Sequence, residues 1–278
     1  MKKIFLIITS AVILSSNGFC QEEKKQSEQN FQGFNLQGYG NGGEKSWDIN
    51  GETAKIEGDK VNLSNVNANS YGGDQKVNVT AQKGTINQTT GEMNLEKDVV
   101  ITSEQGAQMM TDTLNWDRKK DLVTTKDNVI VMDKEMTMTG KGLEAKPGLK
   151  NAKIQENVAV TIATPPKENT PANKLTITSD GPMTMDQAKS MAVFEDNVVA
   201  VDGDRRLKSD RMEIYFDAKN NTINQLVCTG NVEVTQGENQ SYAQKAVYKA
   251  SEQKLILSGR PKLIMDTQGK NGVSAFGN

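Results

Sequence analysis

The stretch LVCTGNVEV, residues 226–234, reads as a β-strand in which apolar and polar residues alternate. A period of two places Val232 and Val234 on one face of a strand and Glu233 on the other. Nearly the same sequence motif, called a word below, recurs as FEDNVVAV (194–201), IQENVAV (154–160), TKDNVIV (125–131) and LEKDVVI (95–101). The chain therefore repeats one strand-forming word, and we expect one apolar face in every copy.

The spacing of these words defines a repeat. Asn-Val or an equivalent pair begins at Asn65, Asp98, Asn128, Asn157, Asn197 and Asn231, and Arg260-Pro261 holds the same place in the last unit. The intervals are about thirty residues, and each unit contains alternating runs and turn residues but no amphipathic helical run. A fixed period of this size is typical of stacked supersecondary units. We therefore predict an all-β chain, in which Asn satisfies local backbone groups at a turn or at the start of a strand.

One interval of 40 residues is longer than the others, and it contains TPPKENTPANK (164–174), with Pro165, Pro166 and Pro171. Proline clusters of this kind are typical of linkers. We predict a first domain over residues 31–164, a Pro-rich linker over 165–173 and a second domain over 174–266. The glycine-rich residues 267–278 are predicted to form a flexible tail.

Residues 1–20 form a unit apart, because Lys2 and Lys3 precede an apolar run from Ile4 to Leu14 and small or polar residues follow. This pattern is typical of a cleaved signal peptide, and the run is too short to cross a bilayer. We predict export to the periplasm, with residues 21–30 as a polar linker. The alternative is lipid modification at Cys20, which would keep the protein at a membrane, but NGF at 17–19 is unlike the Leu-small-small pattern of such sites.

The composition excludes several kinds of chemistry. The chain has no histidine, so a histidine base, a Ser-His-Asp triad and a histidine-ligated zinc site are all excluded. The glycines of GYGNGG (38–43) precede a strand-like SWDI (46–49) and do not open a helix, which argues against nucleotide binding. With a formal net charge of −2, nucleic acid is not a predicted partner. We predict no enzymatic activity, no cofactor and no metal, and a buried, inert thiol at Cys228.

The densest basic stretch is DGDRRLKSDR, residues 202–211. Its cations are Arg205, Arg206, Lys208 and Arg211. One interpretation is a charged hairpin that discourages aggregation between sheet edges. The other is a contact with phosphate groups of an anionic lipid.

The repeated words also carry a family resemblance. Residues 175–265, with LTITSDGPMTMD, MEIYFDAKNNTINQLVCTGNVEV and LSGRPKLIM, resemble the OstA-type domain of the LptA family of lipopolysaccharide-transport proteins. The first half, with SWDINGETAKIEG, VNVTAQKGTINQTTGEMNLEKDVVI and LNWDRKKDLVTTKDNVIV, is similar to the related LptC family. The ordered series of words over most of the chain makes the resemblance specific.

The resemblance implies two open, twisted antiparallel β-jellyroll domains in tandem whose sheets enclose an apolar groove. It implies a periplasmic bridge component, without catalytic residues, that binds lipopolysaccharide through its lipid A acyl chains. The implied partners are the inner-membrane lipopolysaccharide ABC transporter, the outer-membrane lipopolysaccharide translocon, and further copies or homologous jellyrolls joined edge to edge. The chain departs from the family in carrying both kinds of domain and in starting with a short signal where LptC commonly keeps a membrane anchor.

Candidate groove residues are the inward members of the repeated words, and for each of them alone core packing is an equally good explanation. They are Val99, Ile101, Val129, Val131, Val158, Val160, Val198, Ile214, Phe216, Val232, Val234 and Leu257. The rival hypothesis is an exported structural or adhesive β-solenoid with a dry core and no lipid ligand. The irregular intervals and the proline-marked break favour two jellyrolls.

Overall fold

A computed structural model describes residues 29–40, 42–71, 76–117, 119–120, 122–134, 136–146, 151–163, 174–217 and 222–265. The predicted signal peptide, Pro-rich linker and flexible tail lie outside these residues, as does all but the end of the polar linker. Over the described ranges every regular element is a β-strand, which confirms the predicted all-β class. None of the described residues forms a helix long and apolar enough to cross a membrane.

Seventeen strands belong to one sheet. They are β1 (Gln29–Tyr39), β2 (Lys45–Glu57), β3 (Lys60–Ser70), β4 (Val77–Asn87), β5 (Glu92–Ser103), β6 (Gln108–Asp117), β7 (Leu122–Asp133), β8 (Met136–Ala145), β9 (Asn151–Ala163), β10 (Lys174–Ser179), β11 (Met183–Asp186), β12 (Met191–Asp202), β13 (Arg205–Phe216), β14 (Ile223–Gln236), β15 (Asn239–Lys249), β16 (Lys254–Ser258) and β17 (Lys262–Ile264).

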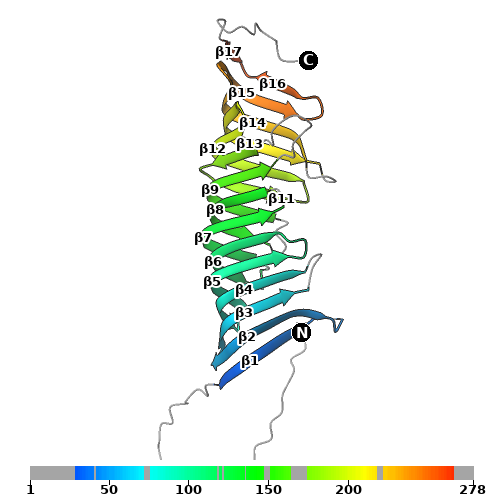
Figure 1. Ribbon diagram of the computed structural model, residues 1–278, viewed down its shortest axis with the longest axis vertical. Coiled ribbons are helices and arrows are strands. Elements are labelled where there is room, and N and C mark those ends of the chain that lie inside the picture. Colours follow the sequence, from blue (N-terminus) through cyan, green and yellow to red (C-terminus); the bar gives the residue numbers. More distant parts are fainter. Residues whose placement is uncertain are drawn as a thin grey trace, which may run out of the picture.

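The strands follow one another as an antiparallel meander, in which each strand from β1 to β9 pairs with the next (Figure 1). The short strands β10 and β11 both pair with β9 on one side and with β12 on the other. In the same way β16 and β17 both pair with β15. Each short pair thus occupies the place of one long strand, and the sheet runs without interruption from β1 to β17.

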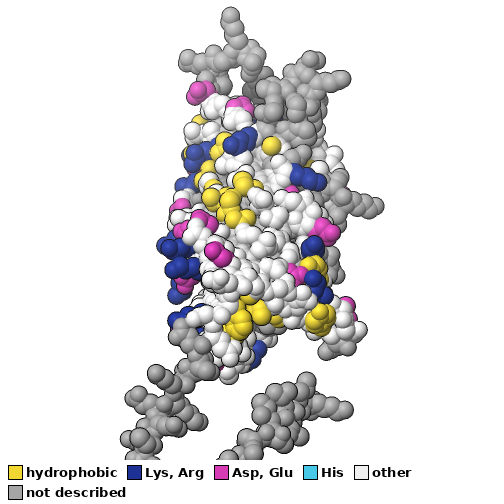
Figure 2. All heavy atoms as spheres, turned by 60° about the horizontal axis from the view of Figure 1, so that its bottom comes forward, with side chains coloured by type: hydrophobic (Ala, Val, Ile, Leu, Met, Phe, Trp, Pro, Cys, Tyr) yellow, Lys and Arg dark blue, Asp and Glu magenta, His cyan; other side chains and the backbone are white. Residues whose placement is uncertain are grey.

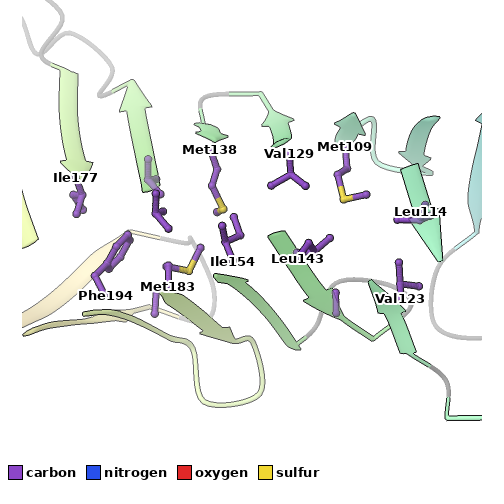
Figure 3. Packing of buried hydrophobic residues seen from close by; sticks show 14 of the residues in the cluster. Met109, Leu114, Val123, Val129, Met138, Leu143, Ile154, Ile177, Met183 and Phe194 are labelled. Carbon is purple, nitrogen blue, oxygen red and sulfur yellow. The ribbon is translucent and has the colours of Figure 1, made fainter. Parts of the chain in front are cut away.

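Most long strands change direction in the middle, so that each contributes to two facing walls. In Figure 3, Met109 and Leu114 of β6 lie on opposite walls, and so do Met138 and Leu143 of β8. The pairing register shifts at these corners, for example between Thr139 and Lys141. This two-walled antiparallel sheet is the β-jellyroll form that the family resemblance implies. Apolar side chains from both walls meet between them.

The corners correct the role predicted for asparagine. Asn231 lies in the middle of β14, and not at a turn or at the start of a strand. Its φ is +46°, and that of Gly230 before it is +78°, so two consecutive residues have left-handed backbone. Two consecutive residues with left-handed backbone also occur at Asp196–Asn197 and at Lys97–Asp98. Asparagine and aspartate tolerate this conformation better than branched residues do, which explains why they precede the valine at the corner.

Strands on either side of residues 164–173 are direct neighbours. Ile177 of β10 lies opposite Val160 of β9 and, on its other side, opposite Ala200 of β12. Because β9 belongs to the first predicted domain and β12 to the second, the hydrogen-bonded ladder continues from one to the other.

Candidate functional site

The space between the two walls holds all twelve residues predicted to line a groove. Seven are at most 4% exposed, namely Val99, Val129, Val158, Val160, Val198, Ile214 and Val232. The other five are partly buried and pack against these, namely Ile101, Val131, Phe216, Val234 and Leu257. The alternation in the sequence therefore identified inward-facing positions from both halves of the chain.

The predicted residues do not all lie on one wall. Val232 and Val234 follow the corner of β14, whereas Ile214 of β13 lies opposite Leu226, which precedes that corner. Leu257 pairs with Ala246 on the same side as Leu226. The repeated Asn-Val words thus supply one wall, and the intervening apolar runs supply the facing one.

Sequence reasoning missed several large interior side chains. Phe194, Met109, Met183 and Met212 are at most 2% exposed and lie among the predicted residues. Three of the four are methionine, whose unbranched thioether adapts to irregular apolar surroundings. Their signal is the same alternation, because Met212 stands two residues from Ile214 and Met109 lies opposite Val131.

Two buried serines, Ser209 and Ser179, lie beside corners of the sheet. Ser209 is 1% exposed and donates a hydrogen bond to the backbone carbonyl of Arg211, at 3.1 Å. Ser179 donates in the same way to the carbonyl of Gly181, at 3.2 Å. These two hydroxyl groups form hydrogen bonds that stabilise the bends. Asp48 is the one charged side chain among the buried residues that the structure describes.

Asp48 lies on the side of β2 opposite Ile49, which is part of the core. Its carboxylate accepts hydrogen bonds from Asn69 Nδ2 at 2.9 Å and from the Tyr71 hydroxyl at 2.7 Å, and it pairs with Lys45 Nζ at 2.8 Å. The bonds from Asn69, Lys45 and Tyr71 hold the pKa of Asp48 well below its usual range. This charge is fully satisfied on the outer face and does not enter the apolar interior.

Cys228 occupies an interior position at the end of the half-strand before the β14 corner. It is fully buried, and burial raises the pKa of its thiol to about 12. A thiol of this kind is not a nucleophile near neutral pH. In the described part of the chain, no group of three or more cysteine, aspartate or glutamate side chains is arranged to hold a metal ion.

The four cations of the basic stretch in β13 differ in exposure and in ion pairing. Arg205, Arg206 and Lys208 are exposed, but Arg211 is half-buried and forms ion pairs with Glu195 and Glu213. Glu213 lies 3.1 Å from the guanidinium, and the pKa of its carboxyl is lowered by the Tyr215 hydroxyl and by Arg211. The four cations are therefore not equivalent, because one of them is already paired.

The outer surface has no single dominant charge on the face shown in Figure 2. Basic and acidic side chains are interleaved along one side, with small apolar patches between them. Mixed charge of this kind keeps an exposed sheet soluble and does not form the continuous basic surface that nucleic acid requires.

Both ends of the two-walled sheet are edges. Within the described residues β1 pairs only with β2, and β17 only with β15. Apolar side chains are exposed at these ends, with Phe31 and Leu263 each at 46% and Met265 at 49%. An unpaired edge with exposed apolar side chains is a template for pairing with a further strand.

A two-walled antiparallel β-sheet with an apolar interior and free edges defines the β-jellyroll class. The chain belongs to the family described as lipopolysaccharide-assembly, LptC-related, whose model matches residues 3–163, more than half of its length. A second model, described as the LptA/(LptD N-terminal domain) LPS transport protein, matches residues 176–276. No curated protein matches the chain. It therefore combines an LptC-like and an LptA-like part in one polypeptide and is a component of the periplasmic lipopolysaccharide-transport bridge.

Proposed function

We propose that the groove binds the acyl chains of lipopolysaccharide and passes the lipid from the inner-membrane ABC transporter toward the outer-membrane translocon. The observation that carries this proposal is the continuity of the apolar interior across both family-matched parts. Val160 of β9 and Ile177 of β10 lie opposite each other where the two parts meet, and both are at most 4% exposed. A lipid moving along the interior would therefore meet apolar side chains on both sides of this junction.

The free energy of burying apolar groups favours acyl chains as the ligand. Burial of a methylene group is worth about 0.8 kcal/mol, so a ten-carbon segment contributes roughly 8 kcal/mol before ordering costs. The walls must move apart to admit it, because the interior side chains are in mutual contact. Methionines such as Met109 and Met212 lower the cost of that rearrangement, since their side chains have several rotatable bonds.

The partners and the absence of catalysis are part of the same proposal. Lipopolysaccharide transport requires no bond to be made or broken by this chain, and energy is supplied by the transporter. The edges at β1 and β17 would each dock onto a neighbouring jellyroll, either a homologue or a second copy, by adding a strand to the sheet. The exposed cations Arg205, Arg206 and Lys208, with Arg211 beside them, are proposed contacts for phosphate groups of the transported lipid.

Site-specific photo-crosslinking in cells tests the groove. A photoreactive residue at Val198 or Val232, which face the interior, is expected to form an adduct with lipopolysaccharide. The matched control is Ile130, which directly follows the interior Val129, is exposed on the outer face and lies away from the cations of β13. Absence of an adduct from both interior positions in folded protein, or equal labelling at Ile130, would contradict the proposal and favour a dry-core structural protein.

A further inference from the structure

A hollow of about 350 Å³ lies on the outer side of the sheet near its C-terminal end, outside the groove. Its polar lining comprises Lys208, Asn231, Glu233, Tyr242, Gln244 and Arg260. These residues come from β13, β14 and β15 and from the corner between β16 and β17. The hollow therefore unites side chains that are distant in the sequence.

The position of each lining residue follows from register and backbone. Lys208, Glu233 and Tyr242 stand directly opposite one another on three neighbouring strands. Arg260 belongs to the last corner, where its φ is +60° and that of Gly259 is +80°. A Cβ at Gly259 would lie 2.5 Å from Cβ of Gln244, so the corner packs closely on β15. This close approach brings Arg260 to the rim of the hollow.

The charge of the hollow is positive. Lys208 and Arg260 are its cations and Glu233 is its one carboxylate. No ion pair joins either cation to an acidic group within the described ranges. Both are therefore available to a ligand, unlike Arg211, which is already held by two glutamates.

A second hollow shows that the positive charge does not come from the fold itself. It lies at the corners of β4, β5 and β6 and is lined by Gln82, Glu96, Lys97, Asp98, Asp112 and Thr113. Three acidic residues there surround one lysine, and the Gln82 amide donates to Asp98. Corner hollows thus recur in the sheet, but of these two only the C-terminal one is lined by more cations than anions.

We propose that the hollow between Lys208 and Arg260 is a binding site for a phosphate group. A guanidinium and an ammonium that line one hollow can both form charge-assisted hydrogen bonds with phosphate oxygens. The Tyr242 hydroxyl and the Asn231 amide line the same hollow but already donate to Gln240 and to Asp210, so the two cations carry the recognition. The phosphate would belong either to a lipid headgroup or to a free phosphate. The site shares Lys208 with the cations proposed above to contact the transported lipid, but it lies on the outer face and can bind phosphate whether or not lipid occupies the groove.

The test uses the full mature chain and two probes. Inorganic phosphate is titrated against isotope-labelled protein, and the backbone amide signals of Gly259 and Arg260 are followed by NMR. Vesicles of phosphatidylcholine containing phosphatidic acid are used in flotation assays to report on a lipid-borne phosphate.

Lys208→Gln and Arg260→Gln should each weaken binding about tenfold. Glu233→Gln should strengthen it, because it removes the only carboxylate of the hollow.

The control variant separates the hollow from general surface charge. Lys254→Gln removes an exposed cation of β16 that does not line the hollow, and it should leave binding unchanged. Binding to vesicles alone identifies a lipid headgroup, and binding to inorganic phosphate identifies a free anion; either supports the site. Binding of neither probe, or an equal loss with Lys254→Gln, would overturn it.

Discussion

The side-chain amide of Asn231 donates a hydrogen bond to Oδ2 of Asp210 at 2.9 Å, and the two residues lie at the corners of adjacent strands. Asn197 donates in the same way to Asp180, also at 2.9 Å. An amide and a carboxylate thus join one corner to the next. The recurring asparagine therefore has two roles, because it adopts the left-handed backbone of the bend and also ties the bend to its neighbour.

Replacing Asn231 by alanine should lower the free energy of unfolding by about 2 kcal/mol, because the variant loses the bond to Asp210 and places a Cβ-bearing residue without local support in left-handed backbone. Asn231→Gly keeps the backbone freedom and loses only the bond, so its loss should be about 1 kcal/mol. Urea unfolding followed by circular dichroism measures both. Equal losses for the two variants would show that backbone conformation at this corner is unimportant.

Asp48→Asn should destabilise the fold by roughly 2 kcal/mol at neutral pH, because the buried carboxylate loses its charge-assisted bonds. The folded-state pKa of Asp48 lies below the unfolded value near 3.8, so its contribution is complete above that value and declines as the pH falls further. The difference in unfolding free energy between wild type and variant should therefore shrink below about pH 4. Asp133→Asn, at an exposed position, is the control. A difference that is constant from pH 7 to pH 3 would refute this role.

The thiol of Cys228 should resist alkylation in the folded protein at pH 8.5 and react rapidly in urea, tested in a Cys20→Ser background. Burial raises its pKa from about 9 to about 12, so the unfolded state releases the proton first. The thiol's contribution to stability is therefore complete below pH 9 and is lost as the pH rises toward 12. The free energy of unfolding of Cys228→Ala should not show this decline between pH 9 and pH 12. Fast labelling of folded protein would show that the interior is open at this site.

A protease site placed between residues 164 and 173 should allow the chain to be cut without separating its halves. The reason is that β9 pairs along most of its length with β10 and β11. The cleaved protein should elute as one species in size-exclusion chromatography. Thr176→Pro, which removes a ladder donor from β10, should weaken the association of the cut halves. Two separate folded species from the cleaved wild type would show that the halves are independent domains.

Much of the candidate groove could be predicted from the sequence. Val198, Val232 and Ile214 were assigned to the interior from alternation alone, because a period of two is a local property of a strand. The assignment of facing walls could not be made, since it depends on where each strand bends. The predicted set omits Met109, Met183, Met212 and Phe194, although the same alternation applies to their strands.

The sequence by itself determined the all-β class, the inward positions and the order of the two family-related parts, because alternation and repeated words are carried by neighbouring residues. Only the tertiary structure decided that Asn231 bends a strand in its middle, that Ile177 continues the sheet beside Val160, and that Lys208 shares a hollow with Arg260. Each of these depends on which strand lies beside which and in what register. Pairing between distant segments sets that register, and no local pattern contains it.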